Sequence, residues 1–314
     1  MNLLGLFKKR IVWRTAIYKV SSLDQIFDLE RLEPFFLIGA QGRRKDKSYP
    51  SVCADPFLFV YHDNLYVFYE LKTDGDHGAI AAAVLSSDGL LTDLGIVLHE
   101  PFHLSYPQVF DYNGVVYMLP ETAQLERVVL YRAKAFPKEW EINSTLINGP
   151  LLDPTLLRIN SHIAYLFGTT RDKTLKIFEL DSMLRIKPGS CRLAHVDKAI
   201  SRCGGSPLKF GESFVRVAQR EITKYGESVA FYKIDNLSES YGETLVVGRH
   251  LFSTPPSWAS EGHHHISVSS FRGELYVAVD GYTKDGYCNT LTYAWIVLKN
   301  KLVYLKKIAL SCFQ

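Results

Sequence analysis

Three carboxyl groups in this sequence occupy places where acid and base chemistry is possible. Asp55 and Asp153 each precede a proline at the start of an apolar stretch, and Glu121 follows Pro120 at the end of another. Cleavage of a glycosidic bond needs two carboxyl groups, one that takes a proton from water and one that protonates the leaving oxygen. Burial would raise the pKa of Glu121 and so suit it to the second role. These residues are therefore candidates for catalytic carboxyl groups.

Purely structural roles account for the same residues. In an Asp-Pro step, the proline fixes the entry into a strand while the aspartate accepts a hydrogen bond from a loop amide. Glu121 and its counterpart Glu70 could both be solvated strand ends. The residues alone leave both explanations open.

Two segments rich in polar and aromatic side chains are candidates for substrate binding. His103 and Tyr106 lie in the run Glu-Pro-Phe-His-Leu-Ser-Tyr-Pro, which offers the rings, imidazoles and hydroxyl groups that bind sugars. A loop held together by its own side chains would explain this run as well. His264 and His265 end the run Glu-Gly-His-His-His and could donate to hydroxyl or phosphate oxygens. No metal site is predicted there, because neighbouring residues of a strand point to opposite faces.

A fivefold repeat must position these residues. An apolar strand, a polar turn and a second apolar strand recur at residues 55–70, 106–121, 153–169, 206–220 and 265–280. Turn pairs such as Asn113-Gly114 supply the positive φ that tight hairpins need. A spacing of roughly 50 residues between repeats is typical of propellers. The sequence therefore predicts an all-β fold, a five-bladed β-propeller.

A hairpin of this length returns the chain to the end from which it started, so the repeats predict where the candidate residues meet. The residues that open the five repeats are expected to form a circle: Asp55, Tyr106, Asp153, Ser206 and His265. The residues about fifteen positions later are expected beside them: Glu70, Glu121, Thr169, Arg220 and Asp280. Ligands of propellers usually bind at the mouth of the central channel, which is the predicted site.

Basic and amide side chains near this mouth are further candidates for ligand contacts. Arg202, Arg216 and Gln219 flank the fourth repeat, and Arg171 follows the third. Guanidinium groups at the mouth would select an anionic ligand such as a phosphorylated or acidic sugar. Each arginine taken alone is equally well explained as a surface residue.

The even repeat predicts one domain. Residues 51–314 are expected to form the propeller, and residues 1–50 are expected to be an N-terminal strand and loop segment that closes it. No stretch approaches the 18 apolar residues that a membrane span requires, so no transmembrane segment is predicted. The sequence does not predict an oligomeric state.

Composition excludes several classes of function. The net charge of +3 comes from interspersed Lys and Arg rather than a long basic run, so no nucleic-acid partner is expected. The 5 cysteines are an odd number without zinc-site spacing, which predicts free thiols and a cytoplasmic location. The sequence has no Gly-rich phosphate loop and no zinc-protease motif, so no cofactor is predicted.

Several short strings resemble, in the same order, the N-terminal domain of plant glucosamine inositolphosphorylceramide transferases and its bacterial relatives. They are found at residues 54–59, 100–107, 120–122, 153–155, 216–219, 225–226, 262–266 and 280–281. That domain is similar to the five-bladed propeller of the family 43 glycoside hydrolases. In the family 43 pattern, a general-base Asp opens the first blade, a pKa-tuning Asp the third and a general-acid Glu the fourth.

The resemblance assigns roles to two residues and leaves a third role open. Asp55 and Asp153 match the base and the tuning residue by position, whereas the fourth repeat opens with Gly204-Gly205-Ser206 and offers no acid. Glu121 or Glu70 would have to replace that acid. Together, the residues and the resemblance predict Asp55 as base, Glu121 as acid and Asp153 as the residue that tunes them.

The leading interpretation is a carbohydrate-active protein that acts on a sugar chain or a glycolipid headgroup in cell-surface polysaccharide biosynthesis. The predicted substrate contacts are Glu70, His103, Tyr106, Arg171, Arg202, Arg216, Gln219, His264 and His265. One alternative is a non-catalytic glycan-binding or partner module, favoured by the missing acid of the fourth repeat. Another is a glycosyltransferase that uses an activated donor such as a nucleotide sugar.

Overall fold

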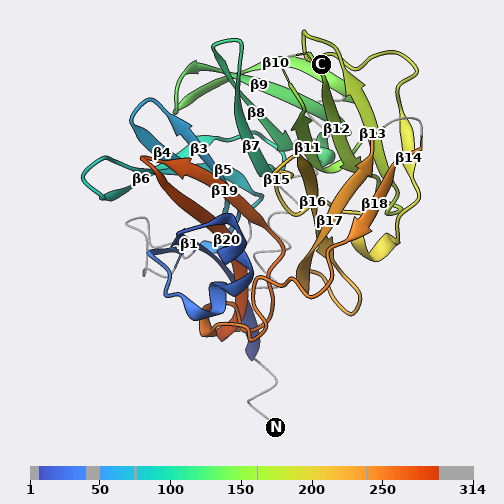
Figure 1. Ribbon diagram of the computed structural model, residues 1–314. Coiled ribbons are helices and arrows are strands. Elements are labelled where there is room, and N and C mark those ends of the chain that lie inside the picture. Colours follow the sequence, from blue (N-terminus) through green and yellow to red (C-terminus); the bar gives the residue numbers. More distant parts are fainter. Residues whose placement is uncertain (1–6, 40–49, 74–75, 161, 238–239, 290–314) are drawn as a thin grey trace.

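A computed structural model describes residues 7–39, 50–73, 76–160, 162–237 and 240–289 of this protein. Five four-stranded antiparallel sheets are arranged around a central axis (Figure 1). The predicted all-β, five-bladed propeller is therefore confirmed. Residues 290–314, which were assigned to the propeller from the sequence, lie outside the described residues.

The first four blades each use consecutive segments of the chain. The first blade contains β3 (Pro50–Tyr61), β4 (Asn64–Thr73), β5 (Ala79–Leu85) and β6 (Leu91–Leu98). The second contains β7 (Ser105–Tyr112), β8 (Val115–Glu121), β9 (Arg127–Ala135) and β10 (Glu139–Asn148). The third contains β11 (Leu152–Arg158), β12 (Ala164–Thr169), β13 (Leu175–Leu180) and β14 (Arg192–Ala194). The fourth contains β15 (Leu208–Phe210), β16 (Ser213–Arg220), β17 (Ser228–Asn236) and β18 (Gly242–Leu245).

The fifth blade combines strands from both ends of the described chain. Its order is β19 (Ile266–Phe271), β20 (Glu274–Asn289), β1 (Phe7–Val20) and β2 (Phe36–Ile38). The β1 and β20 strands pair in antiparallel register from Val12 opposite Thr283 to Val20 opposite Leu275. This pairing joins the N-terminal segment to the last blade, as Figure 1 shows.

Helical structure is limited to short 3-10 segments among the described residues. They are η2 (Leu23–Arg31), η3 (Ala123–Leu125), η4 (Lys198–Ile200) and η5 (Ser257–Ala259). None of the helices described is both long enough and apolar enough to cross a membrane.

The first blade packs against a neighbouring blade on each face, because alternate residues of its strands point to opposite sides of the sheet. In β5, Ala81 and Ala83 pack in a cluster with Ala278 of the fifth blade. The intervening residues, Ile80 and Ala82, pack on the other side with residues of the second blade. Small side chains allow this close approach of neighbouring sheets.

The first strands of three blades carry the same irregularity at equivalent positions. Asp55, Tyr106 and Asp153 have positive φ values of 52°, 52° and 48°. Each lies in a register shift of its hairpin, and each is followed by a proline that has no N–H to donate. A bulge of this kind redirects a side chain, and a left-handed non-glycine residue costs on the order of 1–3 kcal/mol. The contacts that stabilise these bulges define the site.

Candidate functional site

Acidic side chains connect the three bulges from blade to blade. The backbone N–H of Asp55 donates to Oδ2 of Asp280 at 3.0 Å, and that of Tyr106 donates to Oδ2 of Asp55 at 3.2 Å. The backbone N–H of Asp153 donates to Oε2 of Glu121 at 3.0 Å. A carboxyl group of one blade therefore binds the amide at the bulge of the next. The structural role expected of an Asp-Pro step is present in Asp55, and it also brings the carboxyl groups together.

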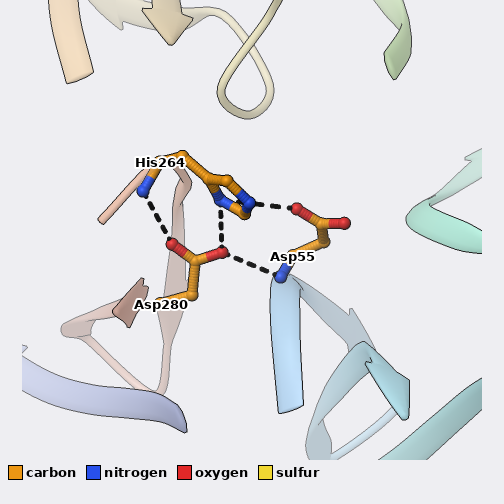
Figure 2. A group of neighbouring side chains, drawn as sticks. All are labelled: Asp55, His264 and Asp280. Atoms are coloured by element: carbon orange, nitrogen blue, oxygen red, sulfur yellow. Dashed lines mark hydrogen bonds and ion pairs between the residues drawn. The ribbon is translucent and has the colours of Figure 1, made fainter. Parts of the chain in front are cut away.

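Asp55, His264 and Asp280 form one half of this cluster (Figure 2). His264 Nδ1 lies 2.7 Å from Asp280 Oδ2 and 3.7 Å from Asp55 Oδ1. Asp280 Oδ1 also accepts hydrogen bonds of 2.9 Å from the backbone N–H groups of His264 and His265. Asp280 is completely buried, so it satisfies three buried amides and one imidazole at once.

The charges in this half stabilise one another. Burial by itself would lower the pKa of His264, but the Asp280 carboxylate raises it to about 9. Burial likewise opposes ionisation of Asp280, yet the imidazolium of His264 holds the pKa of Asp280 below its ordinary value. Burial raises the pKa of Asp55 well above its ordinary value, while His264 acts against that shift. The pair of His264 and Asp280 is thus ionised at neutral pH.

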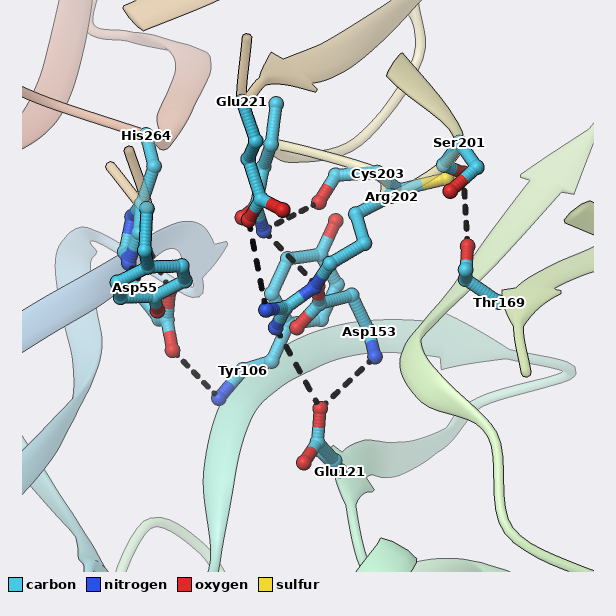
Figure 3. A network of polar contacts seen from close by, with 12 residues as sticks. Asp55, Tyr106, Glu121, Asp153, Thr169, Ser201, Arg202, Cys203, Glu221 and His264 are labelled. Carbon is cyan, nitrogen blue, oxygen red and sulfur yellow. Dashed lines mark hydrogen bonds and ion pairs between the residues drawn. The ribbon is translucent and has the colours of Figure 1, made fainter. Parts of the chain in front are cut away.

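Asp153 and Arg202 form the other half (Figure 3). Arg202 Nε donates to Asp153 Oδ2 at 2.6 Å, and Gln219 Nε2 donates to the same oxygen at 2.8 Å. Arg202 Nη2 lies 4.0 Å from Glu121 Oε2, and its Nη1 lies 3.7 Å from Glu221 Oε1. The guanidinium therefore lies among three carboxyl groups, and the negative charge of Asp153 raises the pKa of Arg202 despite burial.

Glu121 is the acidic group of this half that favours the protonated form. Burial, followed by the charge of Asp153, raises the pKa of Glu121 to about 8, and Arg202 offsets only part of that shift. Glu121 Oε2 accepts from the Asp153 amide, whereas Oε1 has no hydrogen-bond partner among the described residues. About a tenth of the Glu121 side chain is exposed (11%). A partly exposed carboxyl group that holds its proton at neutral pH can donate that proton to a ligand.

Glu70 occupies the equivalent position in the first blade and pairs with His103. Burial raises the pKa of Glu70 to about 7 and lowers that of His103 to about 4. His103 Nδ1 accepts from the Gly78 amide at 2.9 Å, so the neutral ring carries its hydrogen on Nε2, which lies 3.7 Å from Glu70 Oε1. A Cβ atom at Gly78 would lie 2.4 Å from the Leu104 oxygen, so only glycine allows this approach.

Tyr106 and His265 lie beneath the cluster, where both are fully buried. The Tyr106 hydroxyl contacts Thr155 Oγ1 at 2.9 Å and accepts from the Gly205 amide at 2.8 Å. Burial lowers the pKa of His265 to about 3, and neither ring nitrogen has a hydrogen-bond partner in the part of the chain that the structure describes. Both residues support the cluster, and direct contact with a substrate stays a prediction for them.

Three of the arginines singled out in the sequence have other partners. Arg216 is 1% exposed and donates from Nε and Nη2 to the carboxylate of Glu243, at 2.7 and 2.5 Å. Arg171 contacts Glu126 and the Ala123 oxygen at the surface, and Arg220 contacts Glu227 at 2.6 Å. Of the candidates Arg171, Arg202 and Arg216, the structure brings Arg202 to the acidic cluster.

Two residues of the site were not predicted. Tyr225 places its hydroxyl 2.7 Å from His264 Nε2, and its ring lies 5.4 Å from the guanidinium carbon of Arg202. Glu221 links Arg202 to Lys173, whose Nζ donates to Glu221 Oε2 at 3.0 Å. Tyr225 belongs to one of the strings that carry the family resemblance, and that signal could have identified it. Asp280 was placed beside the predicted circle, but no chemical role was given to it.

A divalent cation could be held by Asp55, His264 and Asp280. One ligand atom from each residue lies within 4.8 Å of the others. The short ion pair between His264 and Asp280 already balances charge in this group. The sequence-based expectation of no metal therefore stays a prediction.

The free energy of unfolding is expected to fall as the pH rises from about 6.5 to about 9. The pKa of His264 is raised from 6.5 to about 9, so its stabilising contribution is complete below the lower value and is lost through the higher one. Glu121, with its pKa raised from 4.5 to about 8, acts in the same direction. Urea titrations at several pH values would measure the slope, and His264→Gln should reduce it. Stability that increases over this range would contradict the assignment.

Comparisons with known proteins agree with the fold and with the resemblance found in the sequence. The family model for the N-terminal part of glucosamine inositolphosphorylceramide transferase 1 matches residues 38–282. The Arabidopsis thaliana protein of that name is 34% identical over 250 residues, which cover 73% of this chain and 32% of the plant protein. The Oryza sativa subsp. japonica protein is 35% identical over 255 residues, or 74% of this chain and 33% of the relative. This chain thus spans about a third of the length of these relatives.

Solved structures of glycoside hydrolases share the propeller. An α-L-arabinofuranosidase from Clostridium thermocellum aligns with a TM-score of 0.55 at 15% identity, covering 71% of this chain and 80% of its own. A Bacillus subtilis arabinanase aligns with a TM-score of 0.54 at 12% identity, covering 73% of this chain and 94% of its own. At such identities the likeness shows the fold alone.

Proposed function

This chain belongs to the family of the N-terminal domain of glucosamine inositolphosphorylceramide transferase 1, and from that premise we propose that it acts on a sugar chain or a glycolipid headgroup. The name of these relatives refers to an amino sugar and an inositol-containing lipid. The acidic cluster offers carboxyl, guanidinium and imidazole groups, which can form hydrogen bonds with the polar groups of such ligands. A role in cell-surface glycan metabolism and a cytoplasmic location belong to the same proposal.

The observation that carries this proposal is the state of Glu121. Its carboxyl group has a pKa raised to about 8, a free Oε1 and a position beside Asp153. General acids act best when their pKa lies near the working pH. Glu121 is therefore the proposed proton donor to the leaving oxygen, in the place of the missing acid of the fourth blade.

Asp55 and Asp153 supply the other two proposed roles. Asp153 accepts a hydrogen bond from Arg202 Nε, and the charge of Asp153 helps to raise the pKa of Glu121. Burial raises the pKa of Asp55 well above its ordinary value, and the His264 imidazolium 3.7 Å away acts against that shift, toward the ionised form that a base requires. The charge of Asp55 also raises the pKa of Glu121, as expected for an acid and a base in one cluster.

A non-catalytic glycan-binding module is the second candidate. Its specific support is the fourth blade, where Arg202 occupies the cluster and Gly204-Gly205-Ser206 offers no carboxyl group. Glycosyl transfer from an activated donor would gain support from several arginines at the cluster. Since Arg202 reaches it whereas Arg171 and Arg216 contact other residues, transfer has less support.

A ligand screen with an Asp55→Asn variant tests the proposal. The probes are glucosamine, myo-inositol 1-phosphate, a UDP-activated hexosamine and surface-glycan fragments, with thermal shift and product release as readouts. An enzyme predicts turnover by the wild type and retained affinity without turnover in Asp55→Asn. Binding without turnover in the wild type would support the module instead. Absence of any thermal shift with every probe would contradict both.

A further inference from the structure

One exposed aromatic ring stands over the two charged halves of the cluster. Tyr225 lies between β16 and β17 of the fourth blade, and 50% of its surface is exposed. Its hydroxyl nevertheless reaches inward to His264 Nε2 at 2.7 Å. The ring therefore has an anchored polar end and an open apolar body, the arrangement typical of aromatic residues at binding surfaces.

The contacts of Tyr225 leave part of its ring available. Arg202 lies over the ring at 5.4 Å, and His264 and Trp13 approach it at steep angles, with centroid distances of 5.1 and 6.0 Å. No other aromatic or cationic contact to this ring is found in the described part of the chain. The exposed half of Tyr225 is thus free to pack against a ligand.

The backbone around Tyr225 is held rigidly. The Tyr282 hydroxyl contacts the Tyr225 oxygen at 3.4 Å. Gly226 has a φ of 68°, and a Cβ atom there would lie 2.7 Å from the Trp13 ring, so glycine allows the loop to lie this close. Trp13 in turn stacks on His264 at 4.3 Å and on Tyr282 at 4.5 Å. A ring fixed in this way loses little entropy when a ligand binds.

Arg202, which contacts this ring, and Glu121 beside Arg202 have unused hydrogen-bonding capacity. Arg202 donates one hydrogen bond, from Nε, while its Nη atoms make only the longer contacts of 3.7 and 4.0 Å to carboxyl groups. Glu121 accepts a hydrogen bond at Oε2, and no hydrogen bond to Oε1 is found in the described part of the chain. Sugars present a C–H face and a rim of hydroxyl groups, which match an apolar ring beside such donors and acceptors.

We propose that Tyr225 forms an aromatic subsite, where its exposed ring packs against the C–H face of a sugar ring whose hydroxyl groups reach Arg202 and Glu121. This inference rests on the proposed function and names a residue that determines binding at the same cluster. The hydroxyl group of Tyr225 orients the side chain through His264, and the ring face supplies the contact with the ligand.

Calorimetric titration of the wild type and three variants tests the subsite. The probes are glucosamine, myo-inositol 1-phosphate and UDP-N-acetylglucosamine, each of which presents a ring with C–H groups. Tyr225→Ala is expected to weaken binding about fivefold, because a stacked ring contributes about 1 kcal/mol. Tyr225→Phe keeps the ring and should bind within about twofold of the wild type. Phe35→Ala removes a similarly exposed ring (48%) that lies just before β2 of the fifth blade, and it should leave affinity unchanged.

The outcomes separate the subsite from the function on which it rests. Wild-type-like or tighter binding by Tyr225→Ala would overturn the subsite and leave the proposed function intact. An equal loss in Tyr225→Phe and Tyr225→Ala would overturn it in favour of the hydroxyl group. No binding of any probe by the wild type would overturn both. Should Tyr225→Ala fail to fold, Tyr225→Leu keeps apolar bulk without a flat face, and the same loss is expected.

Discussion

Turnover by a Glu121→Gln variant is expected to fall by about 100- to 10,000-fold, the usual contribution of a general acid. Gln has the shape of a protonated carboxyl group but cannot give up a proton. Its side-chain oxygen can still accept from the Asp153 amide, so the bulge at Asp153 should persist. Affinity for the substrate is expected to stay within about threefold of the wild type, since no charge is removed at neutral pH.

Substrates whose leaving groups differ in their need for a proton provide the most direct test of this prediction. A p-nitrophenyl glycoside needs no protonation to depart, so Glu121→Gln should retain far more activity on it than on the natural linkage. Glu70→Gln is the matched comparison, because Glu70 occupies the equivalent place in the first blade and has a pKa of about 7. A larger loss in Glu70→Gln than in Glu121→Gln would transfer the acid role to Glu70. Equal losses on both substrates would exclude proton donation by Glu121.

The stability of the Glu121→Gln protein provides an internal control. Burial disfavours the charged form of Glu121, so between pH 4.5 and about 8 the wild type must take up a proton at this group on folding. A neutral amide removes that cost, so the variant should unfold at about the same denaturant concentration as the wild type near pH 4.5 and at a higher concentration as the pH rises toward 8. A loss of activity without a loss of stability would then reflect the chemistry alone.

The positions of residues that follow the repeat could be predicted from the sequence. Equivalent residues of the five hairpins lie at the same level along the propeller axis and at the same distance from it. Asp55, Glu70, Glu121 and Asp153 lie at corresponding places in their hairpins, and the structure brings them into one cluster. The fourth repeat departs from this pattern by one residue. The ladder places Gln219 rather than Arg220 at the equivalent position, and a shift of one residue reverses the face of a strand.

The alternation of side chains along a strand also explains why Arg216 does not reach the acidic cluster. Gln219 and Arg216 lie three positions apart on β16, so their side chains point to opposite faces of the sheet. Gln219 therefore reaches Asp153, whereas Arg216 enters the space where Glu243 lies. Tyr225 could not be found in this way, because it lies in a loop outside the repeated hairpin and its place depends on contacts with Trp13 and Tyr282.

Asp280→Ala is expected to lower the free energy of unfolding by about 3–5 kcal/mol, the usual effect of breaking a buried ion pair. Asp280 is completely buried and accepts from the backbone N–H groups of Asp55, His264 and His265. Alanine leaves these three amides without an acceptor, and a buried unsatisfied donor costs about 1–3 kcal/mol. The His264 imidazolium would also lose its counter-charge. Equilibrium urea unfolding near pH 7 measures the change.

A graded set of variants separates the amides from the ion pair. Asp280→Asn keeps one oxygen for the amides of His264 and His265 but cannot accept from Asp55 while that oxygen is in place, so an intermediate loss is expected. Glu126→Ala breaks an exposed pair with Arg171 and should cost less than about 1 kcal/mol. Asp280→Ala should also flatten the decline in stability between pH 6.5 and 9, because the pKa of His264 falls when Asp280 is absent. If Asp280→Ala were as stable as Glu126→Ala, the cluster would not depend on Asp280, and the positions of Asp55 and His264 would need another cause.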